Sequence, residues 1–252
     1  MCIRDRQGSE EIIQAVDKVN ISIARGTTMG LVGESGSGKS TLGRAILRLV
    51  KFSGQVTHCG RDVSLLEGQS LVSFRKKMQV VFQDPYASLN PRLTIEQTLH
   101  EPLVVHQIGI TRMERRDRVV GLLEEVGLES NHLNRYPHEF SGGQRQRVCV
   151  ARALTTEPEF IVCDECVSAM DVSVQAQVLN LLRELQKNRR LTYLFISHDL
   201  SVVKFMSDEI AVMRNGNVEE IGPAEEIYRN PKSSYTRELL ESVPSASLTG
   251  RI

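Results

Sequence analysis

The sequence predicts an α/β fold with a mainly parallel sheet, and two observations support that prediction. First, short apolar runs typical of buried strands alternate with segments of helical periodicity. These runs are residues 28–32, 78–82, 160–163 and 192–196. Second, a glycine-rich segment at residues 33–40 follows the first run directly and precedes a helical segment at 41–49. The order strand, glycine-rich loop, helix is typical of parallel α/β proteins.

The glycine-rich segment, GESGSGKS, fits the pattern G-x-x-x-x-G-K-[ST]. Its glycines let successive backbone N–H groups turn toward phosphate oxygens at the positive end of the following helix. In such a loop Lys39 reaches the β- and γ-phosphates, and the Ser40 hydroxyl ligates Mg²⁺. A chance glycine-rich turn is the alternative, and the flanking strand and helix argue against it. We therefore predict a P-loop NTPase core with nucleotide contacts from Gly33, Ser35, Gly36, Gly38, Lys39, Ser40 and Thr41.

The composition argues against several other classes of protein. With 252 residues, 40% of them apolar, the chain is long enough for one large domain or a domain with a subdomain. Basic and acidic residues both number 31, so we expect no nucleic-acid partner. No apolar run approaches roughly 18 residues and no secretory segment opens the chain, so we expect a cytosolic protein, free or docked on a membrane protein. The five scattered cysteines suit a reducing compartment.

The remaining elements follow in order along the chain. Residues 1–6 lack periodicity and are either a non-native start or a frayed terminus. Alternating residues at 19–23 predict a half-buried strand, and residues 54–57 predict another. From about 94 to 157 strand patterns vanish, which indicates an inserted α-helical subdomain with helices at 111–126 and from Ser141. Ser173 is predicted to cap the next helix, Asn215-Gly216 to join two strands as a hairpin, and residues 223–252 to form a helical tail broken at Pro231.

Two adjacent carboxylates end the apolar run at 160–163. Burying charge without a partner is costly, so Asp164-Glu165 at the end of a buried strand favour a functional explanation. Hydrolysis of a triphosphate needs a second acid near the metal and a group that orients water. We predict that Asp164 holds Mg²⁺, directly or through water, and that Glu165 polarises the attacking water. Gln83 could contact both metal and water, and His198 could donate to the γ-phosphate; taken alone, each would be an ordinary polar residue at a strand end.

Residues 140–147, FSGGQRQR, resemble the signature motif of ATP-binding-cassette (ABC) ATPases. Gln83, Asp164-Glu165, the segment 168–171 and His198 then follow the order of that family's Q-loop, Walker B, D-loop and switch histidine. These five motifs in order make the resemblance specific, and it covers nearly the whole chain from about residue 12. It implies one ABC ATPase domain over residues 1–252 with an antiparallel β subdomain. It also implies a helical signature subdomain at about 94–157 and a C-terminal helical tail at about 223–252.

The resemblance also implies a paired active form. In this family the signature motif covers the γ-phosphate of the partner subunit's nucleotide, a role suited to a helix N-terminus. The residues that would do so here are Ser141, Gly142, Gly143 and Gln144, with Asp171 from the D-loop. The implied cofactors are ATP and Mg²⁺. The implied catalytic residues are Glu165, His198 and Gln83, and the implied metal ligands are Ser40, Gln83 and Asp164.

Four segments resemble the dipeptide/oligopeptide-permease branch of ABC importers, and more closely the shorter of its two paired ATPase subunits. They are residues 83–92, 135–141, 171–180 and 230–236. This resemblance implies an ATP-hydrolysing subunit that powers uptake of di- or oligopeptides or related small solutes, such as nickel or glutathione. We expect it to lie peripherally at the cytoplasmic face of the inner membrane. Expected partners are a second ABC ATPase subunit, paralogous or self, two integral membrane permease subunits and, indirectly, a solute-binding protein.

Two alternatives remain open. One is a non-transport ATPase of phosphonate metabolism, a component of a larger complex that shares these motifs. The other is a nucleic-acid-associated cassette protein. Proteins of that kind carry long coiled-coil insertions or tandem cassettes, whereas this chain has one cassette and no sustained heptads.

Three features depart from the family pattern. Cys166 replaces a usual proline and Met170 a usual leucine, and their similar size leads us to expect that activity survives. Cys163 and Cys166 form a lone C-x-x-C, which is either a redox or metal site or two small apolar side chains. The lack of a second cysteine pair favours the latter. Finally, no aromatic residue precedes Phe52, although the family stacks adenine on an upstream aromatic side chain.

Overall fold

The computed structural model describes residues 2–4, 10–12 and 14–242, which divide into two compact units. The first unit is Met1–Phe74 with Leu194–Ile252, and the second is Arg75–Tyr193. Two elements pass along the chain from one unit into the other, α2 (Gly68–Lys77) and β8 (Thr192–Ile196). The predicted positions 1, 5–6 and 243–252 lie outside the described residues.

The first unit is built around β3 (Thr28–Val32), all of whose residues are buried. β3 pairs in parallel with β9 (Glu209–Arg214), and the last residues of β8 lie next to β3 as well. β9 turns back at Asn215-Gly216 to pair antiparallel with β10 (Asn217–Pro223), which confirms the predicted hairpin. A strand with neighbours on both sides and both faces covered explains why residues 28–32 form one continuous apolar run.

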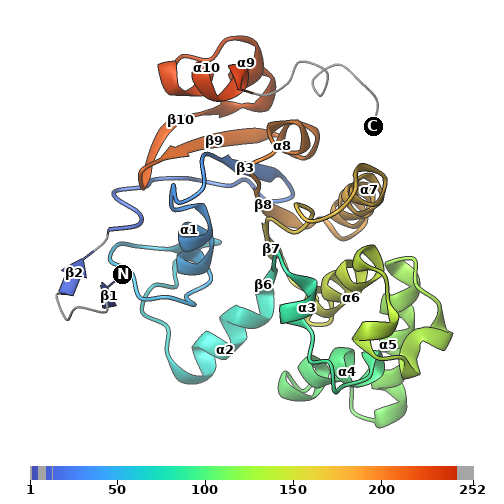
Figure 1. Cartoon of the computed structure of the whole chain (residues 1–252). Helices are drawn as coiled ribbons and strands as arrows, with labels where there is room; N and C mark the ends of the chain where they lie inside the picture. Colours follow the sequence, from blue (N-terminus) through green and yellow to red (C-terminus); the bar gives the residue numbers. More distant parts are fainter. Residues whose placement is uncertain (1, 5–9, 13, 243–252) are drawn as a thin grey trace. The chain divides into compact units, whose positions relative to one another are not determined.

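Helices cover this sheet segment. α1 (Lys39–Ile46) follows the glycine-rich loop, and α8 (Leu200–Met206) packs against β3. α9 (Ala224–Arg229) and α10 (Ser234–Glu241) both contact β10, as Figure 1 shows at the red end of the chain. Two short antiparallel pairs also belong to this unit, β1 (Cys2–Arg4) with β2 (Glu10–Ile12) and β4 (Thr57–His58) with β5 (Arg61–Asp62).

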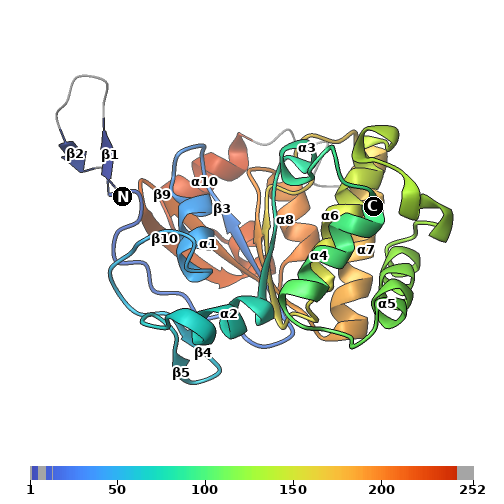
Figure 2. The same cartoon turned by 90° about the horizontal axis from the view of Figure 1, so that it is seen from below.

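The second unit joins two parallel strands to a layer of helices. β6 (Met78–Val81) pairs in parallel with β7 (Phe160–Asp164). Between them the chain forms α3 (Pro85–Ser88), α4 (Ile95–Val105), α5 (Arg112–Glu125), two 3₁₀ turns (Ser130–Asn134 and Pro137–Glu139) and α6 (Gly142–Leu154). α7 (Val172–Arg189) follows β7, and Figure 2 shows α4, α5, α6 and α7 side by side.

Apolar packing and helix caps explain why this stretch is helical. Leu99, Leu103, Val119, Leu123 and Val148 of α4, α5 and α6 are fully buried. Burying each such side chain contributes about 1.5–3 kcal/mol. Each of the three helices begins with a capping box, in which a Ser or Thr side chain and a Glu or Gln three residues later satisfy each other's backbone N–H groups.

The predicted fold class is confirmed, but three local predictions are wrong. Residues 19–23 show the expected alternation of half-buried and exposed side chains, yet they belong to no strand. Alternation reports one-sided burial, and a strand also needs a neighbour to complete its hydrogen-bond ladder. Of residues 54–57 only Thr57 lies in a strand. The cap of α7 is Asp171 and not Ser173, because Asp171 Oδ1 accepts from the Val174 N–H at 3.0 Å. None of the described helices is long and apolar enough to cross a lipid bilayer.

Candidate nucleotide-binding and hydrolysis residues

The glycine-rich loop wraps around the ammonium group of Lys39. Lys39 is only 5% exposed, and its Nζ donates to the carbonyl oxygens of Gly33 (2.8 Å) and Glu34 (2.7 Å) and to Ser37 Oγ (3.3 Å). These bonds fix a positive charge inside the loop. Glu34, Ser35 and Gly36 at its tip are exposed.

Gly38 sets the conformation in which this loop enters α1. Its φ is 102°, in the left-handed region, and an added Cβ would lie 2.2 Å from the carbonyl oxygen of Ala15. No side chain caps α1, and its first turn contains no acidic residue. Its first N–H groups and the positive end of its dipole therefore suit an anion, and the half-buried Ser40 and Thr41 lie in that turn.

His198 belongs to the same unit and follows β8 by two residues. The N–H of Ser197 donates to the carbonyl oxygen of Leu31, in the strand that leads into the glycine-rich loop (3.3 Å). On the other side of His198, Asp199 caps α8 by accepting from the N–H groups of Ser201 (2.8 Å) and Val202 (3.3 Å). Fixed neighbours on both sides hold the backbone of His198, whose side chain is exposed.

In the second unit, Asp164 and Glu165 occupy different environments. Asp164 ends the fully buried strand β7 and is 6% exposed, whereas Glu165 is half-buried. Glu165 adopts a φ of 49°, in the left-handed region that non-glycine residues rarely occupy. Such a conformation costs about 1–3 kcal/mol and is concentrated at functional sites. The backbone thus turns sharply between the two carboxylates.

A hydrogen-bond chain joins Gln83 to this turn. Gln83 Nε2 donates to Ser168 Oγ (3.3 Å), and Ser168 Oγ donates to the carbonyl oxygen of Glu165 (2.9 Å). The amide oxygen of Gln83 and the carboxylate of Asp164 are hard oxygen donors, as is the Ser40 hydroxyl of the first unit. This donor chemistry fits Mg²⁺. The role of Ser168 escapes sequence reasoning, because a serine in a turn has many local explanations.

The predicted signature residues form the start of α6. Ser141 Oγ accepts from the Gln144 N–H (3.3 Å), while Gln144 Oε1 accepts from the Ser141 N–H (3.0 Å). Gly142 is exposed, but Gly143 is buried, and a Cβ on it would lie 2.4 Å from Cγ1 of Val174. The glycine at 143 therefore allows the close approach of α6 and α7.

Asp171 lies at the start of α7 beside this contact. Its Oδ1 accepts from the Val174 N–H (3.0 Å) and from Ser173 Oγ (2.7 Å). The bond from the Val174 backbone, and next the bond from the Ser173 hydroxyl, lower the pKa of Asp171 below its ordinary value. Asp171 therefore stays ionised well into the acidic range.

The C-x-x-C pair is buried next to the carboxylates. Cys163 is 0% and Cys166 1% exposed, and both are free thiols. The hydrogen bond with Cys166, together with burial, raises the pKa of Cys163 well above its usual value. A protonated buried thiol behaves as a small apolar side chain, which favours the packing interpretation of these residues.

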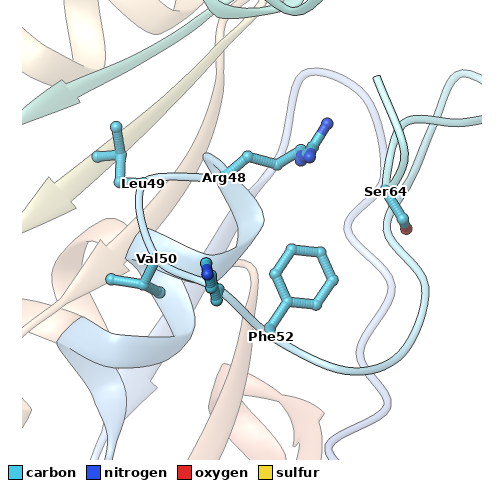
Figure 3. Close-up of a pocket in the computed structure, with 6 residues that line it drawn as sticks. Arg48, Leu49, Val50, Phe52 and Ser64 are labelled. Atoms are coloured by element: carbon cyan, nitrogen blue, oxygen red, sulfur yellow. The ribbon is translucent and has the colours of Figure 1, made fainter. Parts of the chain in front are cut away.

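A pocket of about 380 Å³ lies at the opposite end of α1 from the glycine-rich loop (Figure 3). Arg48, Phe52 and Ser64 line it together with three neighbouring residues. An eight-residue helix spans about 12 Å, so this pocket is separate from the phosphate-binding loop. The Arg48 guanidinium donates to the carbonyl oxygens of Val63 and Leu66, and these hydrogen bonds hold the backbone beside the pocket.

Comparison with known proteins identifies the family. The ABC transporter family model matches residues 16–168. The chain is 54% identical to the oligopeptide transport ATP-binding protein OppF of Bacillus subtilis (strain 168), over 92% of this chain and 77% of that protein. It is 50% identical to the dipeptide transport ATP-binding protein DppF of Lactococcus lactis subsp. cremoris, over 95% of this chain and 78% of that protein.

A solved structure gives the same result. It is described as a dimeric ATP-binding cassette in a post-hydrolysis state bound to ADP and Pi, and it matches with a TM-score of 0.77 at 33% identity. The match covers 86% of this chain and 93% of that one. Both kinds of comparison confirm the predicted family, and the chain belongs to the ABC transporter family.

Proposed function

We propose that this chain is the ATP-hydrolysing subunit of an importer for di- or oligopeptides or related small solutes. Family membership and relatives whose names specify oligopeptide and dipeptide transport support the proposal. The observation that carries it is the buried Lys39 ammonium, hydrogen-bonded into a glycine-rich loop at an uncapped helix start. We further propose that residues 1–252 act as one ABC ATPase domain with a helical signature subdomain at about 94–157.

The glycine-rich loop supplies the triphosphate contacts in this proposal. Loop N–H groups bind phosphate oxygens, and Lys39 exchanges its carbonyl partners for the β- and γ-phosphates. Ser40, Asp164 and Gln83 are the residues that would hold Mg²⁺. When bound, the ion neutralises charge that develops on the β- and γ-phosphate oxygens.

The second group of residues acts on water. Glu165 accepts a proton from the attacking water, and a positioned general base contributes about 10²- to 10⁴-fold to rate. The bond from Gln83 Nε2 to Ser168 leaves the Gln83 amide oxygen as the atom that contacts metal and water. His198 donates to the γ-phosphate, and the backbone hydrogen bond of Ser197 on one side and the Asp199 cap on the other limit the movement of its backbone.

The signature residues and Asp171 act across a subunit interface. The proposed contacts come from Ser141, Gly142, Gly143 and Gln144 at the start of α6. Ser141 and Gly142 are exposed and the first turn has no acidic residue, which suits the γ-phosphate of the paired subunit. The pairing partner is a second ABC ATPase subunit, either a paralogue or a second copy of this chain. Two permease subunits and a solute-binding protein complete the importer, which places this chain at the cytoplasmic face of the membrane. The relatives' names favour transport over phosphonate metabolism.

Uptake by reconstituted vesicles tests the proposal. The vesicles contain the chain with its paired ATPase and its permease subunits. They should accumulate labelled oligopeptide only when ATP is present on the side of the membrane where the two ATPase subunits lie. Lys39→Met, which keeps length and removes charge, should abolish uptake. The matched control Lys51→Met, at an exposed lysine beyond the other end of α1, should not. If the vesicles take up nickel or glutathione with ATP but take up no peptide, then that solute and not a peptide is the transported substrate. Peptide uptake by vesicles with Lys39→Met would contradict the ATPase role.

A further inference from the structure

Three side chains of α6 contact the segment that carries Gln83. Gln146 Nε2 donates to the carbonyl oxygen of Phe82 (3.5 Å), and the Arg152 guanidinium donates to that of Ser88. Tyr86 lies between Phe82 and Ser88 in this segment, and the guanidinium carbon of Arg145 lies 3.7 Å from the centre of its ring. The helix that begins at Ser141 is therefore attached to residues 82–88 along two of its turns.

The contact of Arg145 is the most unusual of the three, because the charge of Arg145 is buried. It is 6% exposed, and its Nε and Nη2 donate to the carbonyl oxygens of Pro137 (2.6 Å) and His138 (3.3 Å). Within the part of the chain that the structure describes, no carboxylate forms an ion pair with it. Two carbonyl groups and the face of the Tyr86 ring therefore surround the cation, and a desolvated cation–π contact is stronger than an exposed one.

The positions of these partners connect two functional segments. Pro137 and His138 form the turn directly before the Ser141 cap. Tyr86 lies in α3, whose cap Asp84 accepts from the Tyr86 N–H (2.8 Å) and follows Gln83 directly. A shift of the Tyr86 ring therefore moves Arg145, and Arg145 holds the backbone that leads into the signature residues.

We propose that Tyr86 is a positioning residue for the signature motif. Its ring holds the Arg145 guanidinium against the Pro137 and His138 carbonyls, and so fixes where Ser141 presents the start of α6. This inference rests on the proposed function, because it gives Ser141 a role in hydrolysis. Tyr86 is 62% exposed, so it contributes little to the apolar core, and its removal should lower global stability by no more than the loss of this one contact.

Amide hydrogen exchange on the isolated chain tests the contact without requiring activity. Tyr86→Leu keeps an apolar side chain but removes the ring face, whereas Tyr86→Phe keeps the face. Exchange at residues 137–144 should accelerate about 2- to 30-fold in Tyr86→Leu, the range that corresponds to a cation–π contact. Tyr86→Phe should match the wild type, as should Met113→Ala, which truncates another exposed side chain, on α5. Unchanged exchange in Tyr86→Leu would overturn the proposal.

The rate of ATP hydrolysis by the paired subunits tests whether this contact positions the signature motif for hydrolysis. Tyr86→Leu should lower kcat by a similar factor with KM for ATP unchanged, and Tyr86→Phe should keep kcat at the wild-type value. Faster exchange with unchanged kcat would show that the contact does not position a functional motif, which overturns the proposal. If the wild-type pair itself hydrolyses no ATP, the proposed function fails, and the exchange experiment still decides whether Tyr86 holds this segment.

Discussion

Gln83 and Ser168 are hydrogen-bonded although 85 positions separate them, with the Gln83 amide nitrogen 3.3 Å from the Ser168 hydroxyl oxygen. The same hydroxyl donates to the Glu165 carbonyl oxygen (2.9 Å). One serine therefore joins the segment that follows β6 to the turn after β7, and it links Gln83 and Glu165, which we propose for metal binding and water activation.

Replacing Ser168 by alanine should loosen that link. A hydrogen bond contributes about 0.5–1.5 kcal/mol, so we expect kcat to fall about 2- to 13-fold while KM for ATP stays unchanged. Steady-state ATPase assays on the paired subunits measure both. The control Ser70→Ala removes an exposed hydroxyl on α2 and should have no effect. A larger change in KM than in kcat would show that Ser168 serves nucleotide binding instead.

The fully buried strands could be predicted from the sequence because burial alone determines their pattern, whereas the strands expected at 19–23 and 54–57 could not. All residues of β3, β7 and β8 are buried, so each reads as a continuous apolar run. The cap of α7 could not, since Asp171 and Ser173 are both good capping residues and only the backbone path selects Asp171.

Side-chain contacts between positions far apart in the sequence are the features that the sequence predicts least well. The bond between Gln83 and Ser168, and the stacking of Tyr86 on Arg145, join positions that no local pattern relates. The candidate residues could be predicted from local patterns and from the order of the motifs along the chain. Neither of these shows which other side chains hold the candidate residues in place.

Ser141→Arg should leave ATP binding largely intact and block hydrolysis. The bulky cation would occupy the exposed start of α6, where we propose that the paired subunit's γ-phosphate binds. In a mixed pair that carries one variant chain, trapped labelled nucleotide should identify the facing chain's phosphate loop as the inactive one. Loss at the variant's own phosphate loop would contradict the proposed pairing. Ser70→Arg, an exposed substitution on α2, is the control.

Gln14→Tyr should strengthen ATP binding. No aromatic residue precedes Phe52, and the neighbouring Ala15 carbonyl packs against Gly38 of the phosphate loop. Base stacking on a ring is worth about 1–3 kcal/mol, or about 5- to 150-fold in affinity. Calorimetric titration should show this gain for Gln14→Tyr but not for Gln14→Leu. The unmodified chain should distinguish ATP from GTP poorly, because phosphate contacts carry no base information. Equal ATP affinity in all three chains would mean that another residue already holds the adenine.

The stability that the Asp171 charge adds should depend on acidic pH. Its pKa is lowered on folding from an ordinary value of 3.8, so the folded protein binds the proton less readily. The contribution is therefore fully present above pH 3.8 and is lost as the pH falls through the lower folded pKa. Asp171→Asn keeps an oxygen cap without the charge. Melting temperatures of the two proteins should differ at pH 7 and converge at strongly acidic pH; a constant difference would contradict this origin of the pKa shift.

Single-turnover ATP hydrolysis by Glu165→Gln tests directly whether Glu165 is the carboxylate that activates water. The amide preserves the shape of the side chain but cannot take a proton from water. ATP affinity, measured by calorimetry on the same preparation, should stay within about 3-fold of wild type, and hydrolysis should slow about 10²- to 10⁴-fold. ATP should then hold the paired subunits together. Hydrolysis within a few-fold of the wild-type rate would show that Glu165 is not the catalytic carboxylate and would contradict the proposed hydrolysis site.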